Sequence, residues 1–206
     1  MLIKMLPAGD SKLIQILDAA LADAARRSGE WLVCRPGCTQ CCVGVFAINQ
    51  LDAVRLRDGL RRLAGDDPER AAALRERVRA SVERLSGGFP GDPLTGELDD
   101  SEEAEARFEE FANEEVCPAL DPATGRCDLY SSRPLPCRAF GPPVRSEGGL
   151  GVCELCYHGA TEEQIAACEM PVDPDGLEPE ILKEVKRRSP LHGLTLVSFA
   201  LSRDEE

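Results

Sequence analysis

Four cysteines fall within nine residues of one short stretch, Cys34-Arg-Pro-Gly-Cys38-Thr-Gln-Cys41-Cys42. Cys38 and Cys41 are separated by two residues, which is the gap that structural zinc sites use to place two sulfurs on one ion. Pro36-Gly37 predicts a turn that folds Cys34 back toward the same ion. Because thiolates are the ligands that soft metals prefer, this stretch predicts half of a metal-binding core.

The other half is expected in a later segment of the chain, where Cys153 and Cys156 repeat the two-residue gap. Cys41 and Cys42 are adjacent, and neighbouring side chains of an extended chain point to opposite sides. This pair therefore predicts either two metal positions or one cluster with spare thiols. Cys168 falls in a predicted helix and is expected to be a buried structural thiol. The later cysteines are Cys117, Cys127, Cys137, Cys153, Cys156 and Cys168.

Five disulfides are the alternative use of ten cysteines, but they need an oxidising compartment and usually a signal peptide. The first residues, from Met1 to Ala8, lack a long apolar region and a cleavage site. The longest apolar region, Leu194 to Leu201, is too short to span a membrane. We therefore expect a cytoplasmic protein with reduced thiols.

The formal net charge of −13 argues against a nucleic-acid partner, which requires a basic surface, and against adhesion to an anionic membrane. Residues 92–116 hold eleven acidic side chains against one base, Arg107. We interpret this run as a solvated helix face or a mobile lid rather than a cation store. The sequence leaves a metal ion as the expected partner and identifies no protein partner.

The charge reverses in residues 117–145, which contain four arginines and two aspartates. Four thiolates around a divalent ion leave a charge of about −2, and guanidinium groups offset it through charge-assisted hydrogen bonds. Arg138, directly after Cys137, is the best-placed arginine for this role. Ordinary surface arginines are the alternative interpretation.

Apolar periodicity and capping residues predict a mainly α fold with an irregular, cysteine-rich core. Asp10 or Ser11 is the expected cap of the first helix, and Asp100 with Glu103 is a possible capping box. The proline-rich stretch from Arg133 to Pro143 is expected to be extended or looped. Residues 144–152 predict a hairpin, and residues 191–202 predict either a strand or a helix. Helices are expected at residues 11–28, 50–64 (capped by Asn49), 67–85 (capped by Asp67), 100–115, 161–166 (opened by the capping box Thr161–Gln164) and 179–188.

These elements predict a single domain over residues 1–206. Its metal-binding core is expected to come from residues 31–48 and 117–160. A helical insertion at residues 49–116 separates the two halves of the core, and residues 161–206 form a C-terminal segment.

The chain resembles the YkgJ-like cysteine-cluster proteins, the family of zinc- or iron-chelating CxxCxxCC domains. The first signature is the Cys34–Cys42 stretch. The second comprises Cys117-Pro-Ala-Leu120, Cys127-Asp-Leu-Tyr130 and Arg133-Pro-Leu-Pro-Cys137-Arg-Ala-Phe140. Three residues separate Cys34 from Cys38, where the shorthand signature has two, so the grouping of the ligands stays open.

The resemblance implies zinc or iron bound by cysteine thiolates, with an iron–sulfur cluster as an alternative form. His158, two residues after Cys156, is an additional candidate, although a lone histidine is more often structural or exposed. The metal ligands that the family pattern implies are Cys34, Cys38, Cys41, Cys42, Cys117, Cys127 and Cys137, together with Cys153 or Cys156 as the later cysteine.

A metal-binding protein without a catalytic site is the expected function. An iron–sulfur enzyme is the first alternative, because the spacing of Cys34, Cys38 and Cys41 also occurs in radical S-adenosylmethionine clusters and some relatives are flagellin lysine methylases. A redox or electron-transfer protein is the second alternative. With two histidines in the chain, a histidine-based catalytic dyad has little support.

Overall fold

The computed structural model describes residues 6–35, 37–146 and 148–203, so Pro36 and Glu147, on which two predicted turns fall, lie outside the described residues. The described chain is mainly α-helical and carries three short antiparallel hairpins. It forms two compact units that interleave along the sequence. Unit 1 comprises described residues 6, 39–134 and 182–203, and unit 2 comprises described residues 7–38 and 135–181.

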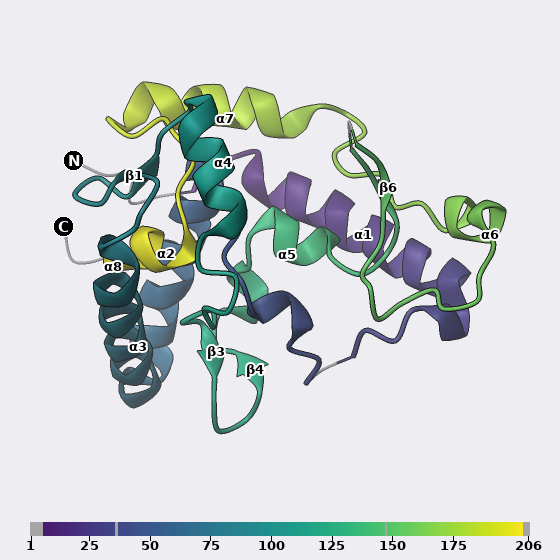
Figure 1. Ribbon diagram of the computed structural model, residues 1–206, viewed down its shortest axis with the longest axis horizontal. Helices are drawn as coiled ribbons and strands as arrows, with labels where there is room; N and C mark the ends of the chain where they lie inside the picture. The colour runs from purple at the N-terminus through teal and green to yellow at the C-terminus, as the bar shows by residue number, and fades with distance from the viewer. Residues whose placement is uncertain (1–5, 36, 147, 204–206) are drawn as a thin grey trace. The chain divides into compact units, whose positions relative to one another are not determined.

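Unit 1 is built on three helices that pack pairwise against one another, α2, α3 and α8 (Figure 1). Their facing sides bury Leu56, Leu60, Leu74 and Leu201 almost completely. Ser81 of α3 and Ser198 of α8 are buried among these apolar residues, where their hydroxyl groups hydrogen-bond at 2.8 Å. Unit 1 therefore has a substantial apolar core. The helices are α2 (Gln50–Asp66), α3 (Pro68–Ser86) and α8 (Val197–Ser202).

The capping residues predicted for α2 and α3 are confirmed. The Asn49 side chain accepts hydrogen bonds from the backbone N–H groups of Leu51 and Asp52 at the start of α2. The Asp67 side chain accepts one from Arg70, and Pro68 occupies the first position of α3, where a missing N–H costs nothing.

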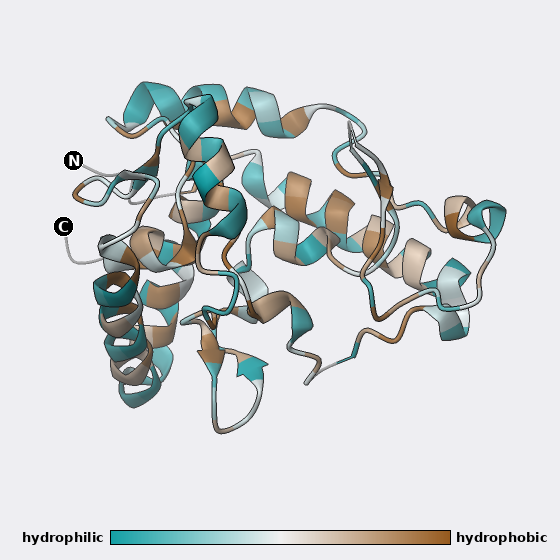
Figure 2. Ribbon diagram, viewed as in Figure 1, coloured by the Kyte–Doolittle hydropathy of each residue, from teal (hydrophilic) through white to brown (hydrophobic). Residues whose placement is uncertain are grey.

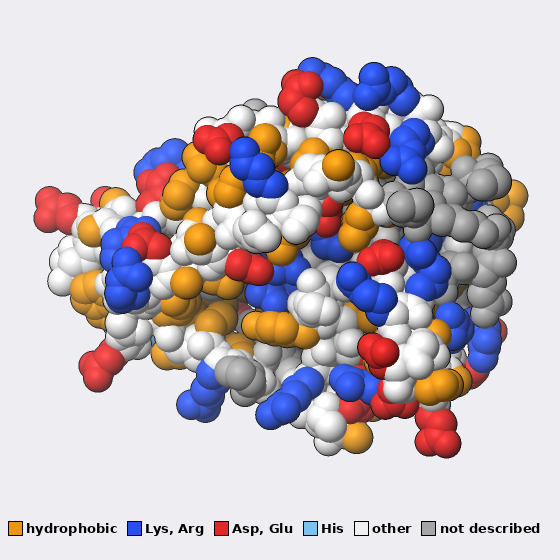
Figure 3. All heavy atoms as spheres, turned by 180° about the vertical axis from the view of Figure 1, so that it is seen from behind, with side chains coloured by type: hydrophobic (Ala, Val, Ile, Leu, Met, Phe, Trp, Pro, Cys, Tyr) orange, Lys and Arg blue, Asp and Glu red, His pale blue; other side chains and the backbone are white. Residues whose placement is uncertain are grey.

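The acidic segment forms a shorter helix than the sequence predicts. α4 (Glu102–Glu110) is capped by Ser101 rather than by Asp100, and it ends because Phe111 is extended and Ala112 has a φ of 54°. The acidic side chains of α4 are exposed, as expected for a solvated helix face. On the face drawn in Figure 3, acidic and basic side chains are intermixed rather than gathered into one patch.

The remaining elements of unit 1 are small. Two of them contain cysteines, as described below. They are the 3₁₀ helices η2 (Gln40–Cys42) and η3 (Tyr130–Ser132) and the hairpins β1 (Gly91–Asp92) with β2 (Glu97–Leu98) and β3 (Leu120–Asp121) with β4 (Arg126–Cys127).

Unit 2 is organised on α1 (Asp10–Ser28), which packs against the short helix α5 (Leu135–Ala139). Hydrophobic residues recur along α1 (Figure 2), and Leu13 and Leu17 are fully buried. The predicted helix is confirmed, but its N-cap is Gly9 without a side-chain hydrogen bond, not Asp10 or Ser11.

The other elements of unit 2 include the hairpin and the capping box that the sequence predicts. They are η1 (Gly29–Trp31), β5 (Val144–Ser146), β6 (Gly149–Gly151), α6 (Glu162–Ala167, with the Thr161–Gln164 capping box) and the start of α7 (Leu177–Arg188), a helix that continues into unit 1.

The prediction for the proline-rich stretch was wrong at α5. This helix is one turn long and contains Pro136 at its second position. Prolines are tolerated in the first turn because the N–H groups there have no partner within the helix. Of the two conformations expected for the C-terminal segment, the helix is the one that forms. Thr195 forms an isolated antiparallel bridge with Ile48, and α8 follows. Across the described residues, no helix is both long enough and apolar enough to cross a membrane.

Candidate metal centre

All ten cysteines are in the thiol form, outside disulfide bonds, and the nine that the sequence singles out as ligands are divided between the two units. The boundary between the units lies between Cys38 and Thr39, so the first cysteine stretch contributes to both units. Unit 1 contains Cys41, Cys42, Cys117 and Cys127, which we call the first thiol set. Unit 2 contains Cys34, Cys38, Cys137, Cys153 and Cys156, together with Cys168.

The adjacent pair in the first thiol set lies in a tight turn rather than in extended chain. Residues Gln40–Cys42 form η2, and the backbone N–H of Cys42 donates to Thr39 at 2.8 Å. The Cys42 thiol donates a hydrogen bond to the sulfur of Cys41. The expectation that these two side chains diverge rested on an extended backbone and is therefore wrong.

Cys117 reaches the adjacent pair through a backbone contact between distant segments. Its N–H donates to the carbonyl oxygen of Cys42 at 2.8 Å, and the neighbouring residues Val43 and Val116 form an antiparallel bridge. Leu120 then donates to the carbonyl oxygen of Cys117 at 3.0 Å and pairs with Cys127 across the β3–β4 hairpin. The backbone thus connects all four cysteines of the first thiol set.

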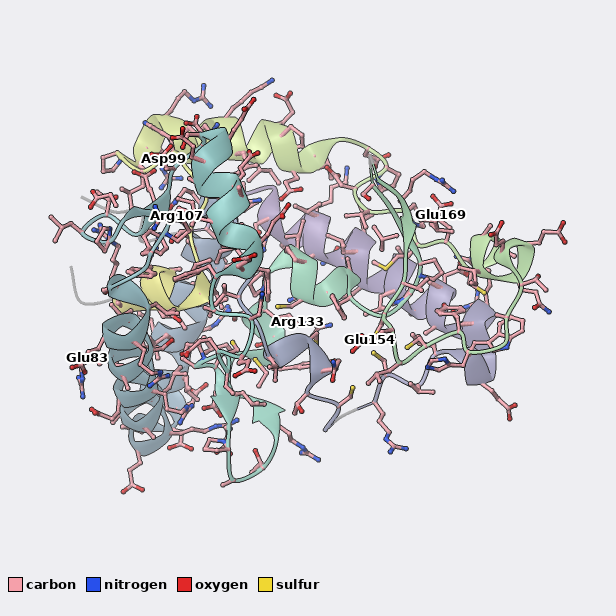
Figure 4. All side chains as sticks on the ribbon, viewed as in Figure 1. Glu83, Asp99, Arg107, Arg133, Glu154 and Glu169 are labelled. Carbon is pink, nitrogen blue, oxygen red and sulfur yellow. The ribbon has the colours of Figure 1, made fainter. Side chains whose placement is uncertain are left out.

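The thiols of this set also act on one another electrostatically. The hydrogen bond from Cys42 lowers the pKa of Cys41 to about 6, and donation of that same bond raises the pKa of Cys42. Burial raises the pKa of Cys117 to about 12 and also raises the pKa of Cys127. Arg133, labelled in Figure 4, lowers the pKa of both Cys41 and Cys127 through its positive charge.

The buried carboxylate of Asp128, next to Cys127, connects helix α3 to the segments that contain Cys117 and Cys127. The Asp128 side chain is 0% exposed and accepts hydrogen bonds from Nε of Arg70 and Nη2 of Arg77, both at 2.5 Å. Nε of Arg77 also donates to the carbonyl oxygen of Pro118 at 2.9 Å, and the N–H of Asp128 donates to Ala119 at 2.8 Å. We call this arrangement the Asp128 clamp.

Sequence reasoning did not identify the Asp128 clamp. A signal for it was present, because Arg70 and Arg77 are seven residues apart and therefore lie on one face of the predicted helix. Nothing in the sequence pattern indicated which carboxylate that face would meet.

In unit 2, Cys153 and Cys156 form a compact loop. The N–H of Cys156 donates to the carbonyl oxygen of Cys153 at 2.9 Å, and the Cys153 thiol donates to the sulfur of Cys156. Both side chains are buried, and burial is the main reason that the pKa of Cys153 is raised. Cys38 lies close enough to raise that pKa further. We call Cys38, Cys153 and Cys156 the second thiol set.

Tyr157 holds this loop in place. It has a left-handed backbone, with a φ of 61°, and its N–H donates to the carbonyl oxygen of Trp31 at 2.9 Å. Its hydroxyl hydrogen-bonds to Ser28, whose own hydroxyl group donates to Ala24. Tyr157 is therefore the donor in its bond to Ser28, and both residues are buried.

Thiols form a large part of the buried cluster around Tyr157. Cys153, Cys156 and Cys168 pack there together, and Trp31 and Leu32 cover them. Cys168, at 2% exposure, confirms the prediction of a buried thiol, although it follows α6 rather than lying inside the helix.

Cys34 and Cys38 lie on either side of a turn in which the N–H of Cys38 donates to Arg35 at 2.9 Å. Gly141, with a φ of 122°, faces Cys34 so closely that a Cβ added there would lie 3.0 Å from the Cys34 sulfur. Cys137 lies in α5, four residues before this glycine.

The remaining candidates are placed as follows. Arg138 is buried, and its Nη1 donates to the carboxylate of Asp18 in α1 at 2.7 Å. The positive charge of Arg133 acts on the thiols of Cys41 and Cys127. His158 and His192 are both exposed.

The chemistry of the donors fits a zinc or iron ion, since both sets offer soft sulfur atoms in hydrogen-bonded pairs. Within the part of the chain that the structure describes, no three His, Cys, Asp or Glu side chains are arranged to hold one metal ion. Thiol protons occupy the sulfur–sulfur contacts, and metal binding would replace them. The sulfurs are therefore gathered but not set at ligand geometry.

Comparison with known proteins adds one finding. A family model described as "CxxCxxCC: Putative zinc- or iron-chelating domain" matches residues 33–156, more than half of the chain. No curated protein and no solved structure matches it. The matched range begins one residue before Cys34 and ends at Cys156, so it contains every cysteine of both thiol sets.

Proposed function

Because the chain belongs to the CxxCxxCC family of zinc- or iron-chelating domains, we propose that it binds zinc or iron through cysteine thiolates and has no catalytic site of its own. The convergence of the first thiol set is the observation that carries this proposal. Cys42 and Cys117 are 75 residues apart in the sequence, yet they share a backbone hydrogen bond. A contact of this kind between two cysteine-bearing segments is what a thiolate site requires.

The proposed ligands are the nine cysteines that the sequence singles out. In unit 1, Arg133 would offset part of the negative charge of the thiolates, and the Asp128 clamp would hold the segments that bear Cys117 and Cys127. The bound ion supplies four or more metal–sulfur bonds that link segments distant in the sequence. The ligands are Cys34, Cys38, Cys41, Cys42, Cys117, Cys127, Cys137, Cys153 and Cys156.

We propose the domain organisation expected from the sequence. The protein is a single domain whose metal-binding core comes from residues 31–48 and 117–160, with a helical insertion at 49–116 and a C-terminal segment at 161–206. A cytoplasmic location belongs to the same proposal, because thiolate ligands require cysteines that stay reduced.

An iron–sulfur cluster is the alternative form of the bound metal. Four cysteines ligate such a cluster as they do a zinc ion, so the first thiol set suits either form. The two forms differ in colour and in sulfide content, which makes them separable by experiment. The enzyme and electron-transfer alternatives depend on this cluster.

The test is elemental analysis of the full chain purified both aerobically and anaerobically, with a visible absorption spectrum of each preparation. We expect stoichiometric zinc in a colourless protein or stoichiometric iron in a coloured one. The matched control is a variant with Cys41, Cys42, Cys117 and Cys127 all changed to Ser, which should bind less metal. A wild-type chain that stays metal-free in both preparations, and after anaerobic reconstitution with each metal, contradicts the proposal.

A further inference from the structure

The last acidic residue of the run at residues 92–116, Glu115, does not belong to a solvated face. The acidic side chains of α4 are exposed, whereas the side chain of Glu115 is only 12% exposed. Glu115 lies two residues before Cys117. A buried carboxylate is costly unless it is paired and hydrogen-bonded, so its contacts indicate what it does.

The carboxylate of Glu115 binds two residues of α3. Its Oε1 accepts hydrogen bonds from Oγ of Ser81 and from Nη2 of Arg84, both at 2.7 Å, and its Oε2 accepts one from Nε of Arg84 at 3.2 Å. A hydroxyl group has one hydrogen, so Ser81, which is 0% exposed, accepts its other hydrogen bond from Ser198 of α8. The carboxylate therefore ends a buried chain of hydroxyl groups that connects α8 with α3.

The backbone of Glu115 pairs with the chain just after the first cysteine stretch. Its carbonyl oxygen accepts from the N–H of Gly44 at 2.9 Å, and the N–H of Cys117 donates to Cys42 at 2.8 Å. Side chains alternate between the two faces of paired segments. Val116, between the two bonds, is accordingly 49% exposed, whereas Cys117 packs against the apolar core and Glu115 reaches α3. Backbone and side chain of Glu115 together hold the start of the segment that bears Cys117.

One face of α3 binds both ends of the segment that bears Cys117 and Cys127. Asp128, directly after Cys127, meets two arginines of this face in the Asp128 clamp. Glu115 meets the next two side chains of the same face. Steps of seven, four and three residues keep these positions on one side of a helix. The four residues of this face are Arg70, Arg77, Ser81 and Arg84.

From these contacts we infer that Glu115 is a positioning residue of the first thiol set. It fixes the Cys117 end of the segment to α3, as Asp128 fixes the Cys127 end, and so keeps Cys117 beside Cys42. Both carboxylate oxygens of Glu115 accept hydrogen bonds from α3, so it acts through Cys117 and not as a ligand. The inference rests on the proposed function and deepens it, because it identifies a residue outside the cysteines that sets the strength of metal binding.

The first test uses the reduced, metal-free full chain and measures how fast iodoacetamide alkylates each cysteine, with peptide mass spectrometry as the readout. Glu115→Gln keeps the size of the side chain but removes its charge. It should speed the alkylation of Cys117 by about 10-fold, because hydrogen bonds to a charged group are lost, and that of Cys127 by less than about 2-fold. Asp128→Asn should instead show its larger change at Cys127.

The second test adds zinc ions and measures the concentration that gives half of the maximal protection of Cys117 against alkylation. Loss of a residue that orients a metal ligand weakens affinity about 10-fold to 100-fold, so Glu115→Gln should raise this concentration by at least about 10-fold. The matched control for both tests is Glu114→Gln, which removes the same charge from the neighbouring, exposed position. It should change neither the alkylation rates nor the zinc concentration.

Arg84→Gln provides a second variant in case Glu115→Gln does not fold, which circular dichroism checks. Because Arg84 is 57% exposed, its loss should leave the fold intact. It removes two of the three hydrogen bonds to the carboxylate. Both values at Cys117 should therefore change in the same direction as in Glu115→Gln, by about 2-fold to 5-fold.

Equal acceleration at Cys117 and Cys127 in Glu115→Gln would assign Glu115 a general structural role and overturn the inference. Unchanged values at Cys117 in every folded variant do the same. Zinc protection that is confined to the cysteines of unit 2 also overturns the inference but leaves the proposed function standing. Failure of the proposed function is distinguishable, because zinc would then protect no cysteine of the wild-type chain.

Discussion

The two thiol sets differ in whether their cysteines belong to the buried core around them. The first thiol set borders an apolar core made by α2, α3 and α8, in which Leu60 and Leu74 are fully buried. In unit 2, by contrast, Cys153, Cys156 and Cys168 are themselves members of the buried cluster, together with Tyr157. A metal bound to the first set would add to a core that already exists, whereas a metal bound to the second would complete one.

The two sets also differ in what holds them. Charge positions the first, through the Asp128 clamp and Arg133. A tyrosine hydroxyl and a strained backbone position the second, through Tyr157. These differences lead to distinct outcomes for the two units in the experiments that follow, which are ordered from the largest expected effect to the smallest.

Removal of the metal should give the largest difference between the responses of the two units. We expect a chelator to loosen unit 2 far more than unit 1, because metal binding contributes folding free energy where a protein core is small. In hydrogen-exchange measurements, amides around Tyr157 and in α1 should exchange about 100-fold faster, while those of α2 and α3 change little. Equal loss of protection in both units would show that the comparison is wrong.

The substitution Asp128→Asn should affect unit 1. It leaves Arg70 and Arg77 without their carboxylate, and removing one partner of a buried pair costs about 3–5 kcal/mol. Because the two arginines are 44% and 24% exposed, we expect a loss of about 2–3 kcal/mol in the free energy of unfolding. Urea denaturation measures it.

Asp128→Asn should also weaken metal binding by the first thiol set about 10-fold to 100-fold, with the second set unchanged. The matched control is Glu76→Gln, which removes an exposed ion pair with Arg79 on the same helix, α3. If both variants behave alike, the clamp has no special role.

Gly59→Ala tests the packing of α2 against η3 in unit 1. An added Cβ would lie 2.4 Å from Oγ of Ser132, which forces a shift of the neighbouring segment. We expect destabilisation by about 1–3 kcal/mol in thermal unfolding. Gly65→Ala, in the same helix with no atom within 4 Å of the added Cβ, should instead be neutral or stabilising by up to about 1 kcal/mol. Both variants should still bind metal, because neither position lies in a segment that contains a cysteine.

Tyr157→Phe tests the hydroxyl that positions the second set. It removes the hydrogen bond to Ser28, which should lower the free energy of unfolding by about 1 kcal/mol and weaken only the metal bound in unit 2. Tyr130→Phe is the control, since this tyrosine is 63% exposed. If metal binding in unit 2 is unchanged in Tyr157→Phe, the ring and the backbone of Tyr157 position the second thiol set without its hydroxyl group.

The smallest effect concerns pH and the ion pair between Arg145 and Glu169 in unit 2. The hydrogen bond from Arg145 lowers the pKa of Glu169. The resulting stabilisation is present above the ordinary pKa of a glutamate and is lost as the pH falls through the lowered value. The midpoint temperature of thermal unfolding should therefore depend slightly less on pH in the acidic range for Glu169→Gln than for the wild type. An identical pH dependence would show that the ion pair contributes nothing to stability.

The helices were the most predictable part of the fold. α2 and α3 follow from apolar periodicity together with Asn49 and Asp67, whose capping hydrogen bonds involve only neighbouring residues. α5 was not predictable in the same way, because a single turn that contains a proline lacks any periodicity. The end of α4 also depends on packing, since Phe111 contacts Phe89 at a ring distance of 6.2 Å instead of continuing the helix.

The residue types of the candidate site were predictable, but their grouping was not. Spacing alone could not show that Cys42 and Cys117 meet, because that contact depends on the backbone bridge between Val43 and Val116. The turn at Cys41 and Cys42 was equally hidden, since an isolated 3₁₀ turn has no sequence period. The Asp128 clamp required knowledge of which face of α3 the hairpin would meet.

The interleaving of the units has a consequence for synthesis on the ribosome. The stretch that ends at Cys42 is translated 75 residues before Cys117 and 111 residues before Cys153. At roughly 5–20 residues per second, its thiols wait about 4–15 seconds for the nearest partner and longer for the rest. During that interval the nascent chain exposes four closely spaced thiols without the segments that later surround them. Its vulnerability to oxidation is therefore set by the speed of translation as well as by the finished fold.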